Sequence, residues 1–230
     1  MNIKDSFRAL TKFEWGLWLV SVAVIITSSL VVPKPDVLSM IASFIGVTAL
    51  IFVAKGYVLG QILCIIFAVF YGIVSFSARY YGEMITYLGM SAPAALVATI
   101  SWIRNPYKKS AEVKVARLTK GKTVVLFLVT GAITWAFYYI LGALGTANLI
   151  VSTFSVATSF LASALLIFRS PMYALAYAAN DIVLITLWVM AAFEDPSSAP
   201  MIACFLMFLC NDLYGFIQWK KMRKRQENDA

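Results

Sequence analysis

The chain has 230 residues, of which 61% are hydrophobic and 13% are charged, and its formal net charge is +8. Charged residues make up about a quarter of an ordinary soluble domain, so this composition excludes that class. The apolar residues are gathered into eight blocks, each near the length that crosses a bilayer as a helix. This pattern predicts an all-α polytopic membrane protein.

The predicted membrane helices occupy, in chain order, residues 13–32, 38–54, 56–76, 82–103, 123–144, 149–168, 171–193 and 199–219. The first follows Lys4, Arg8 and Lys12, and it therefore begins like a signal peptide. It is long for the apolar region of a signal peptide, and no small-residue cleavage site follows it. We therefore expect it to be retained as a membrane helix ahead of the others.

The basic residues predict how these helices are oriented. With eight crossings, seventeen of the nineteen Lys and Arg residues lie on the side that holds both termini, and Lys34 and Arg79 lie on the other. Basic segments remain on the cytoplasmic side of a membrane. We therefore expect both termini in the cytoplasm. The positive charge is then a topology signal and a contact for anionic lipid, not a nucleic-acid site.

The chain also repeats itself at an offset of 116 residues. Residues 41–59 and 157–175 share seven identities in nineteen ungapped positions, and with a one-residue shift Trp102 and Trp219 each end the third helix of a unit. Two three-helix units joined by one further crossing keep the same orientation. The sequence therefore predicts three-plus-one-plus-three parallel repeats, with a substrate site between them near the middle of the membrane.

This arrangement divides the chain into five predicted parts. They are an N-terminal segment with an extra helix, the first repeat, a basic cytoplasmic loop with a linker helix, the second repeat and a basic cytoplasmic tail. Their expected boundaries are residues 1–36, 37–104, 105–148, 149–220 and 221–230.

Two Asn-Asp pairs, Asn180-Asp181 and Asn211-Asp212, lie inside the last two apolar blocks. A charge near the middle of a membrane helix costs about 3 kcal/mol to insert, so such residues usually face a cavity or a pathway. The two Asn residues lie at nearly equal depth on antiparallel helices. We expect both amides to contact a ligand, with the two Asp residues in support. Hydrogen bonding between helices is the alternative role of each amide.

Helical spacing extends this predicted site. Trp188 shares a face with Asn180, and Tyr214 shares one with Asn211. An amide suits a neutral polar ligand, and an aromatic face suits a flat or cationic ring. On the fourth block, Glu83 is expected near the outer face, in a vestibule or at the interface. The predicted substrate-binding residues are Asn180, Asn211, Trp188, Tyr214, Gln61 and Tyr87, supported by Asp181 and Asp212.

Residues near the inner boundary have structural interpretations. Asp212 is the Asp nearer to that basic end, so we expect it to pair with Arg169 or Lys220. Trp102 and Trp219 end their helices at the predicted inner boundary. Tryptophan is enriched at membrane interfaces, so we expect both to be interfacial anchors.

Three segments, at residues 80–90, 101–106 and 211–216, read YYGEMITYLGM, SWIRNP and NDLYGF. They resemble the PnuC family of bacterial nicotinamide riboside transporters, and the resemblance covers roughly residues 13–222. It implies a SWEET-like fold, a homotrimer and a place in the bacterial inner membrane. It also implies facilitated diffusion without a coupling ion, with a cytoplasmic kinase that phosphorylates the substrate. Asn180 and Asn211 stand where the substrate-contacting amides of the family are expected.

The residues and the resemblance together predict a facilitative transporter of nicotinamide riboside. Alternating access would use Gly72, Gly89 and Pro93 as bending points. Lys and Arg are absent from deep positions in the last three blocks, which favours the riboside over the mononucleotide. A transporter of thiamine, riboflavin or a deoxynucleoside is one alternative, and a substrate-sensing membrane scaffold is another. With no His and no nucleophile-plus-base arrangement, neither an enzyme nor a metal or other cofactor is predicted.

Overall fold

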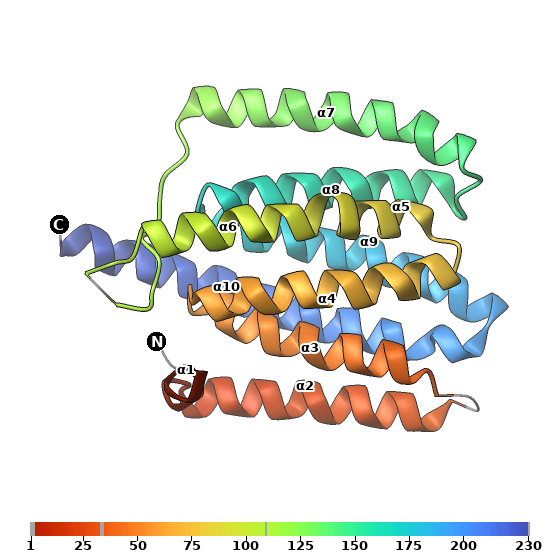
Figure 1. The fold of residues 1–230 in the computed structure, drawn as a ribbon, viewed down its shortest axis with the longest axis horizontal. Coiled ribbons are helices and arrows are strands. Elements are labelled where there is room, and N and C mark those ends of the chain that lie inside the picture. Colours follow the sequence, from red (N-terminus) through yellow and green to blue (C-terminus); the bar gives the residue numbers. More distant parts are fainter. Residues whose placement is uncertain (1–2, 33–34, 109, 230) are drawn as a thin grey trace.

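Long helices running along one axis make up nearly all of the computed structural model, which describes residues 3–32, 35–108 and 110–229 (Figure 1). Within these residues, eight helices are long and apolar enough to cross a membrane. Lys34, one of the two basic residues predicted on the outer side, lies outside the described residues. The long helices are α2 (Lys12–Val31), α3 (Val37–Ala54), α4 (Val58–Ser77), α5 to α6 (Tyr81–Arg104), α7 (Lys120–Ala143), α8 (Leu149–Ile167), α9 (Met172–Glu194) and α10 (Ala199–Asn228).

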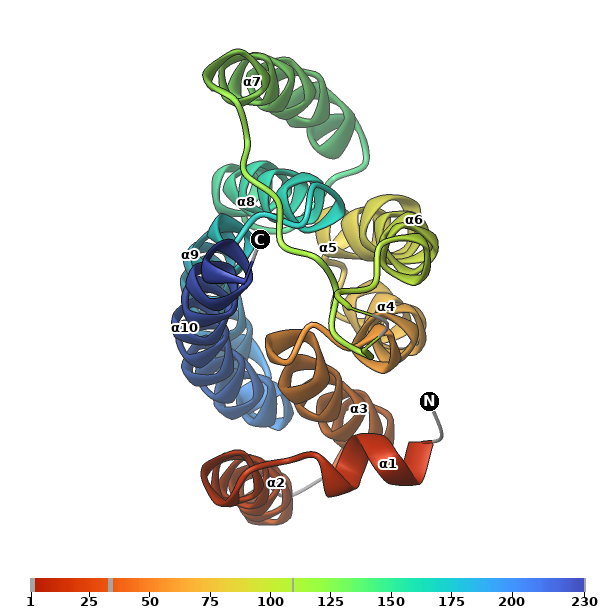
Figure 2. The same ribbon diagram turned by 90° about the vertical axis from the view of Figure 1, so that its left-hand side faces the viewer.

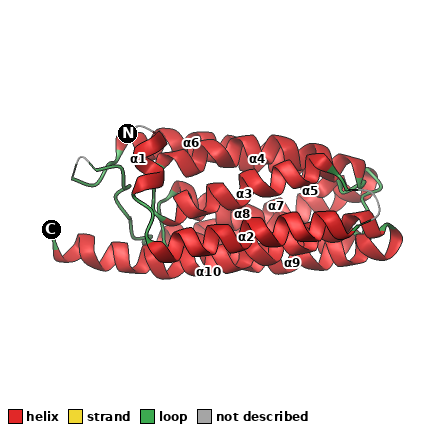
Figure 3. Cartoon of the chain, turned by 90° about the horizontal axis from the view of Figure 1, so that it is seen from below, coloured by secondary structure: helices red, strands yellow, loops and turns green. Residues whose placement is uncertain are grey.

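The eight predicted membrane helices are thus confirmed, with two differences in detail. The fourth is composite, because α5 (Tyr81–Thr86) passes through a π-helical turn, η1 (Tyr87–Ser91), into α6 (Ala92–Arg104). The predicted bending points Gly89 and Pro93 lie in and just after this turn. The last helix continues to Asn228, so most of the predicted basic tail extends α10. Short helices α1 (Ile3–Arg8) and η2 (Pro196–Ser198) complete the helical elements, and the described chain has no β-strand (Figure 3).

Local residue chemistry sets where these helices begin and end. At the start of α2, the Thr11 hydroxyl accepts a bond from the Glu14 amide, and the Glu14 carboxylate accepts one from the Thr11 amide, which forms a capping box. After α3, Gly56 takes a left-handed conformation with φ of 67°, and Arg169 does the same after α8 with φ of 57°. Such residues close the C-terminus of a helix, and the two units therefore turn alike.

Six of the long helices surround a common axis when the described molecule is viewed from one end (Figure 2). In this helix ring, α3 packs against α4 and α10, α8 packs against α5, α6 and α9, and the pairs α4–α6 and α9–α10 complete the circuit. The first helix of each unit therefore contacts the last helix of the other. That reciprocal contact is what two parallel three-helix repeats would produce. Helix α2 packs outside the ring on α3 and α10, and α7 packs outside it on α8.

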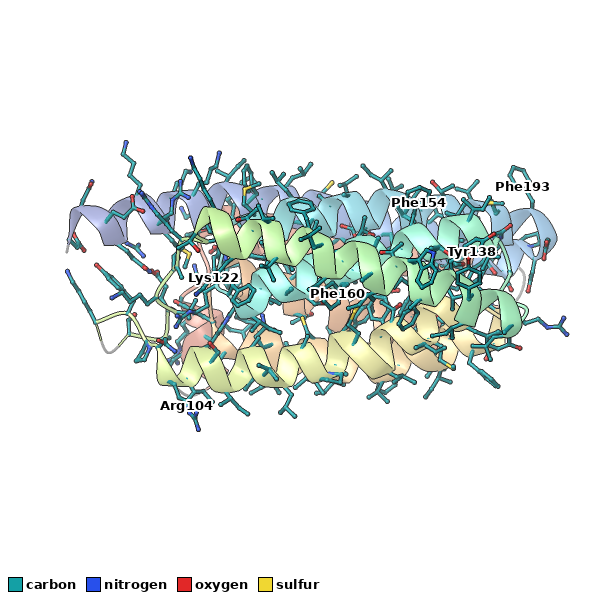
Figure 4. All side chains as sticks on the ribbon, turned by 90° about the horizontal axis from the view of Figure 1, so that it is seen from above. Arg104, Lys122, Tyr138, Phe154, Phe160 and Phe193 are labelled. Atoms are coloured by element: carbon teal, nitrogen blue, oxygen red, sulfur yellow. The ribbon has the colours of Figure 1, made fainter. Side chains whose placement is uncertain are left out.

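Both chain ends and the loop after α6 lie at one end of the molecule (Figures 1 and 3). Figure 4 shows Arg104 and Lys122 near this same end and Tyr138 and Phe193 toward the opposite one. We refer to the first as the inner end and to the second as the outer end. Large apolar side chains such as Leu128 and Trp135 are exposed along α7, as a lipid-facing helix requires.

Candidate functional site

A cavity of about 60 Å³ lies inside the helix ring. A single water needs roughly 10–15 Å³ on this measure, so the cavity holds a few waters and must widen to admit a larger ligand. Both units contribute to its walls. The polar and aromatic lining residues are Gln61, Cys64, Phe67, Tyr87 and Ser91 from the first unit, and Tyr173, Tyr177, Asp181, Phe208 and Asp212 from the second.

Asp181 of α9 and Asp212 of α10 form a carboxyl pair in the cavity wall. They are 2% and 3% exposed, and their side chains lie within hydrogen-bonding reach of each other. Two carboxylates this close repel each other unless a proton or a cation lies between them. The pair is therefore suited to a ligand that brings hydrogen-bond donors or positive charge into the cavity.

The expected pairing of Asp212 with a basic residue is wrong, since none of the ion pairs among the described residues includes Asp212. Lys220 lies two helical turns further along α10, with its ammonium group 4.5 Å from the Phe216 ring centre. Arg169 lies in the turn between α8 and α9, where burial lowers the pKa of its guanidinium group. Asp212 instead lies on the face of α10 that meets α9.

The asparagines of the two pairs face away from the cavity. The Asn180 Oδ1 atom accepts hydrogen bonds from Thr158 Oγ1 at 2.8 Å and Ser159 Oγ at 3.0 Å, both on α8. Asn211 Nδ2 donates to the Met207 carbonyl at 2.7 Å and to Ser21 Oγ of α2 at 3.3 Å. Adjacent residues on a helix point about 100° apart, so in each pair the Asn side chain faces a neighbouring helix while the Asp side chain faces the cavity. The aspartates, not the asparagines, line the cavity.

Gln61 and Tyr87 were expected to face the site from the first unit, and both line the cavity. Gln61 is fully buried, and neither atom of its amide group has a hydrogen-bond partner in the described part of the chain. Buried amides are normally satisfied, so an unpaired one at a cavity wall is available to a ligand. Tyr87, at the start of the π-helical turn, presents its ring to the same space.

Trp188 and Tyr214 were also expected at the site, but they lie apart from the cavity. The Trp188 indole nitrogen donates to the Tyr71 hydroxyl at 3.0 Å in the outer half of the ring. The Tyr214 hydroxyl donates to Glu14 Oε1 at 3.0 Å and accepts a bond from Gln218 Nε2 at 2.8 Å. Glu14 also pairs with the Lys55 ammonium at 2.9 Å. Tyr214 thus fastens α10 to the extra helix α2.

Two tyrosines of α9, Tyr173 and Tyr177, line the cavity although they were absent from the predicted site. They lie eight and four residues before Asp181, so the three share one helical face. A second signal was present in the repeat, because the offset of 116 places Tyr177 opposite Gln61. Anchoring the stripe on Asp181 instead of Asn180 would have identified both tyrosines.

Trp102 and Trp219 close the ring on its inner side. Their ring centres are 5.5 Å apart, and Trp219 Nε1 donates to the Val53 carbonyl at 2.9 Å. With exposures of 1% and 0% they are buried within the protein, so their expected role as interfacial anchors is wrong. The equivalent tryptophans of the two units thus contact each other, one from the last turn of α6 and the other from within α10.

Between α6 and α7, residues 105–108 and 110–118 form a strap across the inner end of the ring (Figure 2). The Val113 amide donates to the Gly56 carbonyl at 3.1 Å, and the Ala116 amide donates to the Arg169 carbonyl at 3.0 Å. The strap therefore touches the equivalent inner turns of both units. Glu112 forms an ion pair with Arg225 of α10. Burial, together with the Glu112 carboxylate, raises the pKa of Tyr57, whose backbone pairs with this residue.

Comparison with known proteins agrees with this architecture. The family model described as nicotinamide mononucleotide transporter matches residues 36–221. Two curated relatives are named nicotinamide riboside transporter PnuC: one from Neisseria mucosa is 27% identical over 96% of this chain and 86% of its own length. The other, from Haemophilus influenzae, is 28% identical over 84% of each chain. This chain belongs to the PnuC family of transporters.

A solved structure extends the likeness to three dimensions. The crystal structure of the vitamin B3 transporter PnuC superposes on this chain with a TM-score of 0.83 and 27% identity. The match covers 95% of this chain and 94% of the other. The helix ring, the outer helices α2 and α7 and the strap thus belong to a PnuC fold.

Proposed function

We propose that this protein carries nicotinamide riboside across a bacterial inner membrane by facilitated diffusion. The main support is the naming of both curated relatives as nicotinamide riboside transporters. The cavity between the two units supplies a place for such a ligand, with a carboxyl pair, a free amide and several aromatic rings in its walls. We assign the two units to the expected repeats at residues 37–104 and 149–220, in an arrangement like that of the SWEET proteins, and the contacts of α3 with α10 and of α8 with α6 support this assignment.

The chemistry of the cavity suits each part of this substrate. Nicotinamide riboside joins a positively charged pyridinium ring to a carboxamide and a ribose. A carboxylate is a strong acceptor for ribose hydroxyls, and the unpaired Gln61 amide matches a carboxamide. The faces of Tyr87 and Tyr177 suit a cationic ring, which is drawn to the negative face of an aromatic system.

The same walls favour the riboside over the mononucleotide named in the family description. Among the described residues that line the cavity there are two carboxyl groups and neither Lys nor Arg. A phosphate group is normally held by a cation or by a helix N-terminus, and it is repelled by carboxylates. A phosphorylated ligand would therefore lose at this site the interactions that a riboside gains.

Alternating access follows from the two closures of the ring. The contact between the Trp102 and Trp219 rings closes the inner side. At the outer end, the Tyr80 hydroxyl donates to the Leu187 carbonyl at 2.7 Å, which joins the two units. Movement of one unit against the other would open these closures in turn. We further propose a homotrimer with cytoplasmic termini, no coupling ion, and a cytoplasmic kinase that phosphorylates the transported riboside.

Counterflow in proteoliposomes tests the proposal. Vesicles loaded with unlabelled nicotinamide riboside should accumulate the labelled compound without any ion gradient, whereas external nicotinamide mononucleotide should not exchange. Exchange confined to thiamine, riboflavin or a deoxynucleoside would assign a different substrate. Saturable binding of nicotinamide riboside without any exchange would support a sensing scaffold and contradict transport.

A further inference from the structure

Glu83 is a buried carboxyl that the cavity does not explain. It lies in the first turn of α5 and is 0% exposed, and neither carboxyl oxygen has a hydrogen-bond partner among the described residues. It lies toward the outer end, as expected, but it is buried inside the protein and not exposed at the membrane interface (Figure 1). The Ser155 side chain of α8 is its polar neighbour across the boundary between the two units.

Among the described residues, no basic side chain forms an ion pair with this carboxyl. The ion pairs between described residues involve other acids, namely Glu14, Glu112, Glu227 and Asp229. Arg79, the basic residue of the preceding turn, is exposed. An ionised carboxylate buried without a partner is unfavourable, and such groups are seldom retained for stability alone.

Unpaired polar atoms connect Glu83 to the cavity. Thr86 Oγ1 and Ser91 Oγ on the same composite helix, and Asn180 Nδ2 on α9, are buried without partners in the described structure. Ser155 Oγ lies 3.5 Å from Asn180 Oδ1, which links the Glu83 side of the ring to the Asn-Asp pair. Tyr87 follows Glu83 by four residues on this helix and lines the cavity together with Asp181. A polar seam therefore runs along the boundary between the units, from the carboxyl pair to Glu83.

The backbone of the same helix is irregular between Glu83 and the cavity. The π-helical turn at Tyr87–Ser91 begins four residues after Glu83, and both of its end residues line the cavity. Such turns often occur at functional sites, where they redirect side chains. The second unit has Ala199 or Pro200 at the position of Glu83, so helix packing at this place in the fold has no general need for a carboxyl group.

We propose that Glu83 is an outer binding residue for the positively charged ring of the substrate, and that it selects cationic ribosides over neutral ones. A pyridinium ring beside Glu83 would supply the missing counter-charge. The seam then leads it past Tyr87 to the carboxyl pair. This inference rests on the proposed function and adds to it a determinant of charge selectivity outside the central cavity.

The experiment compares two probes in the same proteoliposomes. One is nicotinamide riboside, and the other is the C-riboside of benzamide, in which a carbon atom replaces the charged ring nitrogen and the shape is kept. The wild-type protein should exchange the cationic probe at least about tenfold faster at limiting concentration, the effect expected from pairing one positive charge with one buried carboxylate. Glu83→Gln should remove most of this preference by slowing exchange of the cationic probe, with the neutral probe changed less than about twofold.

Three controls separate charge from folding. Glu83→Asp keeps the charge and should keep most of the preference. Glu194→Gln removes an exposed outer carboxyl and should change neither probe. Monodisperse elution of each purified variant confirms that it is folded.

The possible outcomes distinguish failure of the inference about Glu83 from failure of the proposed function. Equal exchange of both probes by the wild-type protein would overturn the inference even if Glu83→Gln did not fold. An unchanged preference in Glu83→Gln, or an equal loss of both probes, would also overturn it. Failure of the wild-type protein to exchange nicotinamide riboside at all would instead refute the proposed function.

Discussion

The two three-helix units make reciprocal contacts in the helix ring but contribute different residues to the cavity wall. At their inner ends, the equivalent residues Trp102 and Trp219 contact each other, with ring centres 5.5 Å apart. Their cavity walls do not match. The first unit contributes the unpaired amide of Gln61 and an interrupted third helix, and the second contributes the carboxyl pair on two regular helices.

This difference suggests that the two similar units have different roles in binding a ligand. In the cavity wall, both carboxyl groups come from the second unit, and the irregular helix comes from the first. Packing differs as well, because Gly60 of α4 corresponds to Ala176 of α9 at the offset of 116. A ligand between the units would be held by charge from one side, while the other side has the irregular helix that can adjust around it.

The largest effect should come from removing charge in the second unit. Asp212→Asn should lower the affinity for nicotinamide riboside by about 10-fold or more, because a hydrogen bond to a charged group contributes about 1.5–3 kcal/mol. Asp181→Asn should act similarly, and the double variant should lose less than the sum, since the two carboxyls act as a pair. Calorimetric titration of the purified variants measures these affinities.

Alanine at the neighbouring asparagine is the matched comparison. Asn211→Ala removes a side chain that contacts Met207 and Ser21, not the cavity, so its affinity should fall less than that of Asp212→Asn. The free energy of unfolding of this variant should fall instead, by about 1 kcal/mol for the lost hydrogen bonding. If Asn211→Ala lowered the affinity more than Asp212→Asn, the ligand contacts would have to be assigned to the asparagine amides.

The second prediction concerns the tight packing within the first unit. A Cβ atom added at Gly60 would lie 2.5 Å from the Val53 backbone nitrogen, whereas one added at Gly16 of α2 would meet nothing within 4 Å. Overpacking of this kind costs about 1–3 kcal/mol. Gly60→Ala should therefore lower the melting temperature by several degrees, at about 2–4 °C per kcal/mol for a chain of this size.

Gly16→Ala serves as the control and should leave the melting temperature nearly unchanged, as measured by thermal unfolding in detergent. Equal melting temperatures for the two variants would mean that α3 and α4 do not approach as closely as the structure has them.

The smallest effect should come from the strap, which contacts the inner turns of both units. Glu112→Gln breaks the ion pair with Arg225, and an exposed pair of this kind contributes about 0.2–1 kcal/mol. The backbone amides of residues 112–116 should then exchange hydrogen faster, by up to about fivefold. Mass spectrometry of hydrogen exchange resolves such a change.

Lys224→Gln is the control for the strap, because Lys224 is exposed on the same stretch of α10 and should leave that exchange unchanged. Slower exchange in Glu112→Gln would show that the ion pair does not hold the strap in place.

The fold was predictable from the sequence because its main determinant is chain-wide. Apolar blocks of bilayer length, separated by charged segments, defined each long helix to within a few residues, except at the end of α10, and the repeat offset predicted which helices are equivalent. The extension of α10 to Asn228 was missed because its last turns are polar. Hydrogen bonds from the strap, such as that from the Val115 amide to Gln226 Oε1, hold these turns in place.

The sequence predicted the depth of the candidate site along the last two helices, but not which face of each helix meets the cavity. Asn180 and Asp181 are neighbours, and only the direction each faces decides which one meets the cavity. In a soluble helix, hydrophobicity marks the inner face. In a membrane, lipid and protein interior are similarly apolar, so the pattern does not distinguish them. The same uncertainty concealed Tyr173 and Tyr177, and it let Trp102 and Trp219 be interpreted as surface anchors. Glu83 depends on the packing of α5 against α8, which no local pattern encodes.

The central claim is that nicotinamide riboside binds between the two units at the carboxyl pair, and a structure with the riboside bound tests it most directly. The account predicts a widened cavity in which the ligand lies within about 3.2 Å of Gln61 and of a carboxyl oxygen of Asp181 or Asp212. A riboside held by Asn180 and Asn211, with the carboxyl pair untouched, or one bound outside the helix ring, would contradict it.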